Sequence, residues 1–309
     1  MKHSMILSLL LVVFCTPFAL SQIPLDNLVA PGTKAVVLGE GYGFCEGPAA
    51  DTLGNIYFSD GTKDTIHFYP YGQAVQKFID SYDANGMMFN SLGELGVCEG
   101  AAFQVVAIHP RTKEKRVLAG KVNGERFFNE PNDLTFDATN GFYFTDPNYK
   151  HRGQETIRKE DVYYVSSTGE VSCVSTVCSN PNGILLTPDD KILYVADCGG
   201  KKIYRYKVDG PGKLSDERLW IDLGAHPDGM TLDRDGNLYM ACGPAGVIIY
   251  DKEGKKIGTL SKEHGIPYAS NCVFGGPNFS ILYITAADKF IGIPTKTEGI
   301  RSRHFELVP

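Results

Sequence analysis

The chain has 309 residues, a formal net charge of −6 at pH 7 and a pI near 5.7. Its 34 Gly and 17 Pro are spread along the chain without forming a flexible linker, so the length is compatible with one large folded body. The acidic balance argues against a nucleic-acid surface, which needs clustered Lys and Arg. We therefore expect no nucleic-acid partner.

The first 22 residues have the pattern of a secretory signal peptide. Lys2 and His3 precede the apolar run 5–13, and the small-residue stretch 19–21 resembles a cleavage site. The apolar run is too short to anchor the chain in a bilayer. We therefore predict a signal peptide over residues 1–22, no membrane association, and a mature protein that is secreted, either periplasmic or extracellular.

After the signal peptide, the chain repeats one unit in which a polar turn joins two apolar runs. The turn begins six times, at Asp51, Asn90, Asp137, Thr187, Asp233 and Gly276. Successive turns start 39 to 50 residues apart, which is the period of four-stranded propeller blades and not of short solenoid coils. Helical periodicity is absent from these runs. The sequence predicts an all-β fold, a six-bladed β-propeller that forms a single domain over residues 23–309.

Five positions before each turn stands a carboxylate or a carboxamide. These residues, called the axial ring below, are Glu46, Asn85, Asn132, Asn182, Asp228 and Asn271. Equivalent positions at the start of the innermost strands of a propeller line its central channel, so the six side chains should converge on the axis. Each residue alone could instead cap a turn through its own backbone. Six polar residues at one offset favour a shared site.

The chemistry of the axial ring favours calcium. Its two carboxylates and four amide oxygens, without His or Cys, form the hard-oxygen set that Ca²⁺ prefers. Mg²⁺ demands a tighter octahedral geometry, and another divalent cation such as Mn²⁺ or Zn²⁺ could substitute in vitro. A second periodic set, Asp60, Asp146 and Asp197, ends the strand that follows the turn. We expect these residues at the opposite end of the strand from the ring, where they would organise the following turns.

Seven cysteines remain after removal of the signal peptide, at positions 45, 98, 173, 178, 198, 242 and 272. An odd number leaves at least one free thiol, and the spacing shows no disulfide framework. Most lie in apolar runs, where free Cys packs as a small hydrophobe. Cys173 and Cys178 are close enough in sequence to pair, and this alternative stays open.

Six short motifs resemble those of the senescence marker protein, gluconolactonase and luciferin-regenerating enzyme family. They are Glu46-Gly-Pro, Asn129-Glu-Pro-Asn-Asp-Leu, Tyr143-Phe-Thr-Asp-Pro, Pro181-Asn-Gly-Ile, Leu193-Tyr-Val-Ala-Asp and Pro227-Asp-Gly-Met. The resemblance implies a six-bladed propeller lactonase with a divalent metal, usually calcium, in its channel. It implies that Glu46, Asn132, Asn182 and Asp228 hold the metal, and it places Asn271 near the site.

Two positions depart from the pattern of that family. Thr231 stands where members with a second, structural calcium carry an acidic residue, so we predict no second ion. Glu130 stands where sugar lactonases often carry a serine or a basic residue that contacts the substrate. The identity of the substrate is therefore the part of the resemblance that transfers least.

Catalysis at such a site needs a Lewis acid and a base. A calcium ion can stabilise the charge that develops on a lactone carbonyl as water adds. The base candidates are Asp228 and its neighbour in the ring region, Asp133. The substrate-binding candidates are Asn85, Asn132, Asn271, His226 and Tyr149.

Three functions remain open. The first is a secreted, metal-dependent hydrolase of lactones, with a small-molecule lactone or ester as its partner. The second is an organophosphate or aryl-ester hydrolase that uses the same site. The third is a non-catalytic propeller that binds a ligand or protein and holds a structural metal. The G-x-S-x-G, H-E-x-x-H and P-loop motifs are absent, which removes the common serine hydrolase, zincin and nucleotide-binding alternatives. We expect a monomer.

Overall fold

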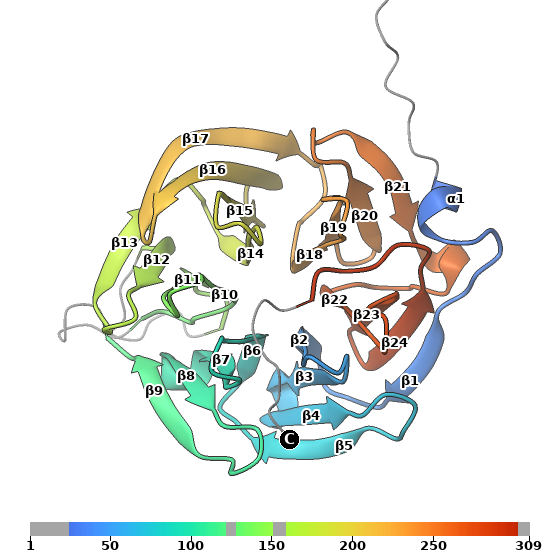
Figure 1. Cartoon of the computed structure of the whole chain (residues 1–309), viewed down its shortest axis with the longest axis horizontal. Coiled ribbons are helices and arrows are strands. Elements are labelled where there is room, and N and C mark those ends of the chain that lie inside the picture. Colours follow the sequence, from blue (N-terminus) through green and yellow to red (C-terminus); the bar gives the residue numbers. More distant parts are fainter. Residues whose placement is uncertain (1–24, 122–127, 151–158, 302–309) are drawn as a thin grey trace, which may run out of the picture.

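The computed structural model describes residues 25–121, 128–150 and 159–301. Six four-stranded antiparallel sheets surround a central axis like the blades of a propeller (Figure 1). The six-bladed β-propeller predicted from the repeat is thereby confirmed. The predicted signal peptide lies outside the described residues.

Five blades each consist of four consecutive strands, ordered from the axis outwards. The first two blades contain β2 (Cys45–Ala50), β3 (Ile56–Asp60), β4 (Thr65–Tyr69), β5 (Gln76–Asp80), β6 (Ala84–Phe89), β7 (Leu95–Glu99), β8 (Gln104–Ile108) and β9 (Lys115–Ala119). The third and fourth contain β10 (Leu134–Phe136), β11 (Phe142–Asp146), β12 (Asp161–Val165), β13 (Val171–Ser175), β14 (Pro181–Leu186), β15 (Ile192–Asp197), β16 (Lys202–Gly210) and β17 (Lys213–Asp222). The fifth contains β18 (Met230–Leu232), β19 (Leu238–Ala241), β20 (Val247–Tyr250) and β21 (Lys256–Leu260).

The sixth blade joins the two ends of the described chain. Its inner strands are β22 (Asn271–Gly275), β23 (Ile281–Ala286) and β24 (Lys289–Pro294), and its outer strand is the N-terminal β1 (Val36–Glu40). The remaining elements are short: α1 (Leu25–Leu28), η1 (Gly61–Lys63), η2 (Gly100–Ala102) and η3 (Lys262–His264). Across the described ranges, no helix has the length and apolar character needed to cross a membrane.

The recurring turn joins the first strand of a blade to the second, and the first residue of the turn stabilises it. The Asp51 carboxylate accepts hydrogen bonds from the backbone N–H groups of Leu53 and Asn55, both at 2.9 Å. Asn90, Asp137 and Asp233 accept equivalent bonds two and four residues ahead. This local chemistry explains why Asp and Asn recur at the start of the turn.

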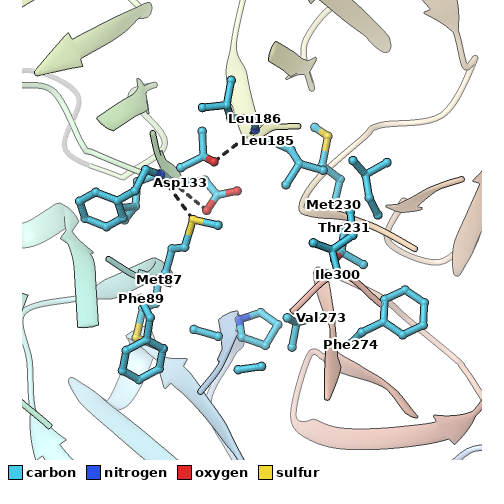
Figure 2. A pocket seen from close by; sticks show the side chains of 18 of the residues that line it. Met87, Phe89, Asp133, Leu185, Leu186, Met230, Thr231, Val273, Phe274 and Ile300 are labelled. Atoms are coloured by element: carbon cyan, nitrogen blue, oxygen red, sulfur yellow. Dashed lines mark hydrogen bonds between the residues drawn. The ribbon is translucent and has the colours of Figure 1, made fainter. Parts of the chain in front are cut away.

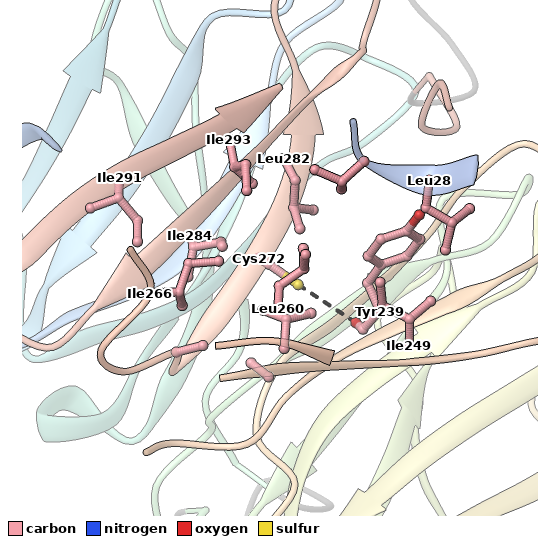
Figure 3. Close-up of a cluster of buried hydrophobic side chains, with 14 of the residues drawn as sticks. Leu28, Tyr239, Ile249, Leu260, Ile266, Cys272, Leu282, Ile284, Ile291 and Ile293 are labelled. Atoms are coloured by element: carbon pink, nitrogen blue, oxygen red, sulfur yellow. Dashed lines mark hydrogen bonds between the residues drawn. The ribbon is translucent and has the colours of Figure 1, made fainter. Parts of the chain in front are cut away.

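The hydrophobic core lies between neighbouring blades. The middle strands are buried on both faces, so their sequences are continuously apolar, as in the Ile-Tyr-Phe run of β3. Figure 3 shows one such cluster, in which Tyr239 and Ile249 of the fifth blade pack against Cys272, Leu282 and Ile284 of the sixth. Leu28 of α1 covers the same cluster. Because each blade packs against the next, the innermost strands are held rigidly around the axis.

All seven cysteines at positions 45, 98, 173, 178, 198, 242 and 272 are free. The pairing of Cys173 with Cys178 that the sequence left open is therefore not formed. Cys173 is exposed on the outer strand β13, whereas Cys178 is buried in the cluster between the third and fourth blades. The five other thiols include four that are buried in or beside the apolar clusters, as their sequence context predicts.

Candidate metal centre and active site

The axial ring lies where the innermost strands approach each other most closely. Glu46, Asn85, Asn182 and Asn271 are the first or second residues of their strands, and Asn132 and Asp228 lie two residues before theirs. Backbone hydrogen bonds join neighbouring blades at this level: Gly86 donates to the Asn132 carbonyl at 2.7 Å, and Gly229 donates to the Ser270 carbonyl at 2.9 Å. The predicted positions are thus brought together at one end of the channel.

Glycine follows the ring residue in four of the six blades, and the reason is space. A Cβ atom on Gly47 would lie 1.9 Å from the Asn85 carbonyl oxygen of the next blade. A Cβ atom on Gly229 would lie 1.9 Å from the Asn271 carboxamide carbon. These contacts are impossible for any side chain, so glycine is what allows the ring to close.

Three carboxylates face one another in this buried region. Burial, and then the charge of Asp228, raise the pKa of Glu46 well above its ordinary value, with a further contribution from Asp133. Burial and the Asp133 charge raise the pKa of Asp228 to about 8. Burial raises the pKa of Asp133 to about 7. The groups that oppose these shifts are hydrogen-bond donors and not cations.

The donor set therefore fits a divalent cation. Three carboxylates held together in a buried site repel each other unless a positive charge lies among them. The Asn132 side chain is only 4 % exposed, and its Oδ1 atom is buried without a hydrogen-bond partner among the described residues. A bound cation would satisfy this oxygen. In the part of the chain that the structure describes, no three His, Cys, Asp or Glu residues form a metal-holding group, so carboxamide oxygens must complete the set.

Asp133 and Asn271 support the ring from within. The Asp133 carboxylate accepts hydrogen bonds from the backbone N–H groups of Leu134 at 2.9 Å and Ile184 at 3.2 Å. The Asn271 Oδ1 atom accepts from Cys272 N–H at 2.8 Å, and the Asn271 side chain is hydrogen-bonded to Glu46. Both oxygens of Asp133 are thus engaged by backbone groups, and Asn271 holds a predicted metal ligand.

His226 and Tyr149 lie beside the ring residue Asn182. The Tyr149 hydroxyl accepts a hydrogen bond from Asn182 Nδ2 at 3.0 Å. The exposed His226 places Nδ1 2.9 Å from the Cys198 carbonyl oxygen and 3.8 Å from the Cys198 thiol. Cys198 is a residue that the sequence reasoning missed, although its position directly after the periodic Asp197 was a usable signal.

The half-buried Asn85 stands at its expected place in the ring. The hydrogen bond recorded for it in this region is made by its backbone, whose carbonyl accepts from the Ser59 hydroxyl at 3.0 Å. Its role as a substrate-binding residue stays a prediction.

The expectation for Asp60, Asp146 and Asp197 is wrong. The strands pair antiparallel, so the end of the second strand lies beside the start of the first: Cys45 is opposite Asp60, and Pro181 is opposite Asp197. These carboxylates are therefore at the ring end. They bind the backbone that enters the innermost strand, as when Asp146 accepts from Asn129 and Glu130 N–H, both at 2.9 Å. Asp197 also accepts from Gly200 in the following turn.

Beyond the ring, the channel widens into a cavity of about 150 Å³ (Figure 2). Asp133 and Asn271 belong to its lining, and the walls are mainly apolar side chains from the innermost strands, among them Met87, Leu186, Met230 and Val273. Thr231 also lines this space, at the position where an acidic residue would be needed for a second ion. Polar chemistry is thus concentrated at one end of the channel.

Comparison with known proteins gives a consistent result. The family model described as SMP-30/Gluconolactonase/LRE-like region matches residues 44–288. A gluconolactonase of Zymomonas mobilis is 29 % identical over 306 residues, covering 89 % of this chain and 85 % of the relative.

Two solved structures share the fold. A gluconolactonase of Xanthomonas campestris has a TM-score of 0.80 at 23 % identity, covering 88 % of this chain and 92 % of the other. A calcium-binding regucalcin of Agrobacterium tumefaciens has a TM-score of 0.74 at 19 % identity, covering 89 % and 98 %. With four fifths of the chain matched by the family model, the protein belongs to the SMP-30/gluconolactonase/LRE-like family.

Proposed function

We propose that the protein is a calcium-dependent lactonase that opens a sugar lactone by hydrolysis, and that it acts after export. The observation that carries the proposal is the meeting of Glu46, Asp133 and Asp228 with the unpartnered Asn132 oxygen in a member of this family. The gluconolactonase named among its relatives suggests the substrate class. Export is inferred from residues 1–22.

The residues that would hold the cation are Glu46, Asn132, Asn182 and Asp228. When bound, Ca²⁺ supplies Lewis-acid stabilisation of the charge that develops on the lactone carbonyl. Asp228 is the base in this proposal, because its raised pKa, about 8, suits a group that accepts a proton near neutral pH. Asp133 is a weaker candidate, since both of its oxygens already accept backbone hydrogen bonds. Its role is to hold negative charge behind the ring.

The mouth of the site would bind the hydroxyl groups of the substrate. His226 is exposed beside Asp228, and its Nδ1 atom is engaged by the Cys198 carbonyl, so Nε2 is the nitrogen left to face a ligand. Tyr149 presents a half-exposed ring on the same side. Asn132 and Asn85 complete the polar rim that would orient the lactone.

The test is acid release from glucono-, galactono- and aryl-lactones, followed in a pH-stat with calcium, with chelator, and after calcium is restored. The proposal expects turnover that chelation abolishes and calcium restores. It also expects that Asp228→Asn, checked for bound calcium by calorimetry, loses at least about a hundredfold in kcat, as for the loss of a general base. Absence of turnover across the panel with calcium bound would overturn the proposal in favour of a non-catalytic binding propeller. Turnover of aryl esters alone would favour the ester-hydrolase alternative.

A further inference from the structure

The Asn182 carboxamide can serve a cation only in one of its two orientations. Its oxygen is a ligand for a hard cation, whereas its NH₂ group is a donor that would repel one. The two orientations have the same shape, so packing alone does not select between them. Something must hold the NH₂ group away from the ring centre.

The hydrogen bonds of Asn182 supply that selection. Its Nδ2 atom donates to the Tyr149 hydroxyl at 3.0 Å, and its side chain is also hydrogen-bonded to the Asp228 carboxylate. A carboxylate only accepts, so this second bond also uses a hydrogen of the NH₂ group. With both amide hydrogens engaged, Oδ1 is the one atom of the carboxamide that remains to bind a cation.

Tyr149 can act as an acceptor because its own hydrogen is directed elsewhere. The Tyr149 hydroxyl is hydrogen-bonded to the thiol of Cys198, on the far side from Asn182. The chain of bonds therefore runs from Asn182 to Tyr149 to Cys198. A hydroxyl that donates at one side is polarised to accept better at the other.

We propose that Tyr149 is a positioning residue, which holds the Asn182 carboxamide with its oxygen towards the axial ring and so sets the calcium affinity of the site. Tyr149 follows β11 in the third blade, and Asn182 lies in β14 of the fourth, so the bond also fixes one blade against the next at the ring. The inference deepens the proposed calcium site and rests on it. It gives Tyr149 a task beyond the substrate contact expected from the sequence.

The experiment measures calcium binding to the full-length mature protein by isothermal titration calorimetry, without substrate. Tyr149→Phe keeps the ring and removes the hydroxyl, so we expect calcium affinity to fall by about tenfold, as when the partner of a metal ligand is removed. The matched control is Tyr164→Phe. It deletes a buried hydroxyl of the same blade that donates to Asp137 at 2.7 Å, in the turn away from the ring, so calcium affinity should stay unchanged.

A double-mutant cycle separates orientation from a general structural effect. In an Asn182→Asp background the two oxygens of the side chain are equivalent, so no partner is needed to orient them. Tyr149→Phe should then change calcium affinity by less than about twofold. An equal loss in both backgrounds, or wild-type affinity in Tyr149→Phe alone, would overturn the inference. Failure of the proposed calcium site would show differently, as a lack of calcium binding in the wild-type protein itself.

Discussion

The axial ring depends on single atoms where neighbouring strands approach each other. At Gly229 the missing side chain makes room for the Asn271 carboxamide, which in turn is hydrogen-bonded to Glu46. The sequence motif Pro227-Asp228-Gly229 thus combines a predicted metal ligand with the space that its neighbour requires. At this scale, the choice of glycine is a steric requirement and not a matter of backbone conformation.

Gly229→Ala should therefore damage both stability and metal binding. The added methyl group must displace Asn271, at a cost of roughly 1 to 3 kcal/mol in the free energy of unfolding, as for other overpacked sites. Gly210→Ala is the matched control, because a Cβ there meets no atom within 4 Å. Denaturant unfolding of the two variants without calcium checks the prediction. Equal stability of Gly229→Ala and Gly210→Ala would show that the ring can yield at this point.

At the scale of strands and turns, Asp146 fixes the segment that enters the third blade. Its two oxygens each accept one backbone N–H, from Asn129 and Glu130, and it is fully buried. Asp146→Asn keeps the shape but turns an NH₂ group towards one of these donors. We expect a loss of about 1 to 3 kcal/mol, the cost of an unsatisfied buried group. Asp222→Asn, at an exposed strand end, should unfold like the wild type in the same thermal or denaturant measurement.

The periodicity predicts the blades well because each repeat is a local pattern. The turn residues Asp51 and Asp233 act on backbone groups two and four residues away, so their role can be inferred from sequence alone. Asp146 was misplaced because its position depends on antiparallel pairing with the preceding strand. Counting along one strand does not reveal which end of its neighbour lies beside it.

The candidate site shows the same division. The six ring positions follow from one offset in the repeat, and the structure brings them to one end of the channel. The contact between Tyr149 and Asn182 joins two blades through a segment outside the repeat, so no period predicts it. Cys198 was missed for the same reason, since its importance lies in its neighbours and not in its residue type.

At the scale of the whole molecule, the propeller is closed by β1. This strand pairs with β24 of the last blade, Val36 opposite Gly292 and Val37 opposite Ile291. Removing residues 25–40 should leave β24 as an open edge and separate the ends of the ring, so we expect aggregation and loss of a cooperative unfolding transition. The control Val36→Ser/Val37→Ser changes only exposed side chains and should stay within about 0.5 kcal/mol of the wild type. Size-exclusion chromatography and thermal unfolding compare the two.

The closed ring also couples folding to pH and calcium. Glu46, Asp133 and Asp228 have raised pKa values in the folded, metal-free protein, to about 7 for Asp133 and about 8 for Asp228. Between about pH 4 and pH 8, the folded state therefore holds protons that the unfolded chain has already released. Through these groups, the stability of the metal-free protein should fall as pH rises across this range.

Calcium should reverse that trend, because it binds the ionised carboxylates and must displace their protons at low pH. We expect the apparent calcium affinity to be at least about tenfold weaker at pH 5 than at pH 8, with a correspondingly smaller increase in the unfolding temperature. Asp228→Asn should reduce the pH dependence of metal-free stability. Thermal unfolding at both pH values, with calcium and with chelator, checks each statement. Equal stabilisation by calcium at pH 5 and pH 8 would mean that the cation binds away from these three carboxylates.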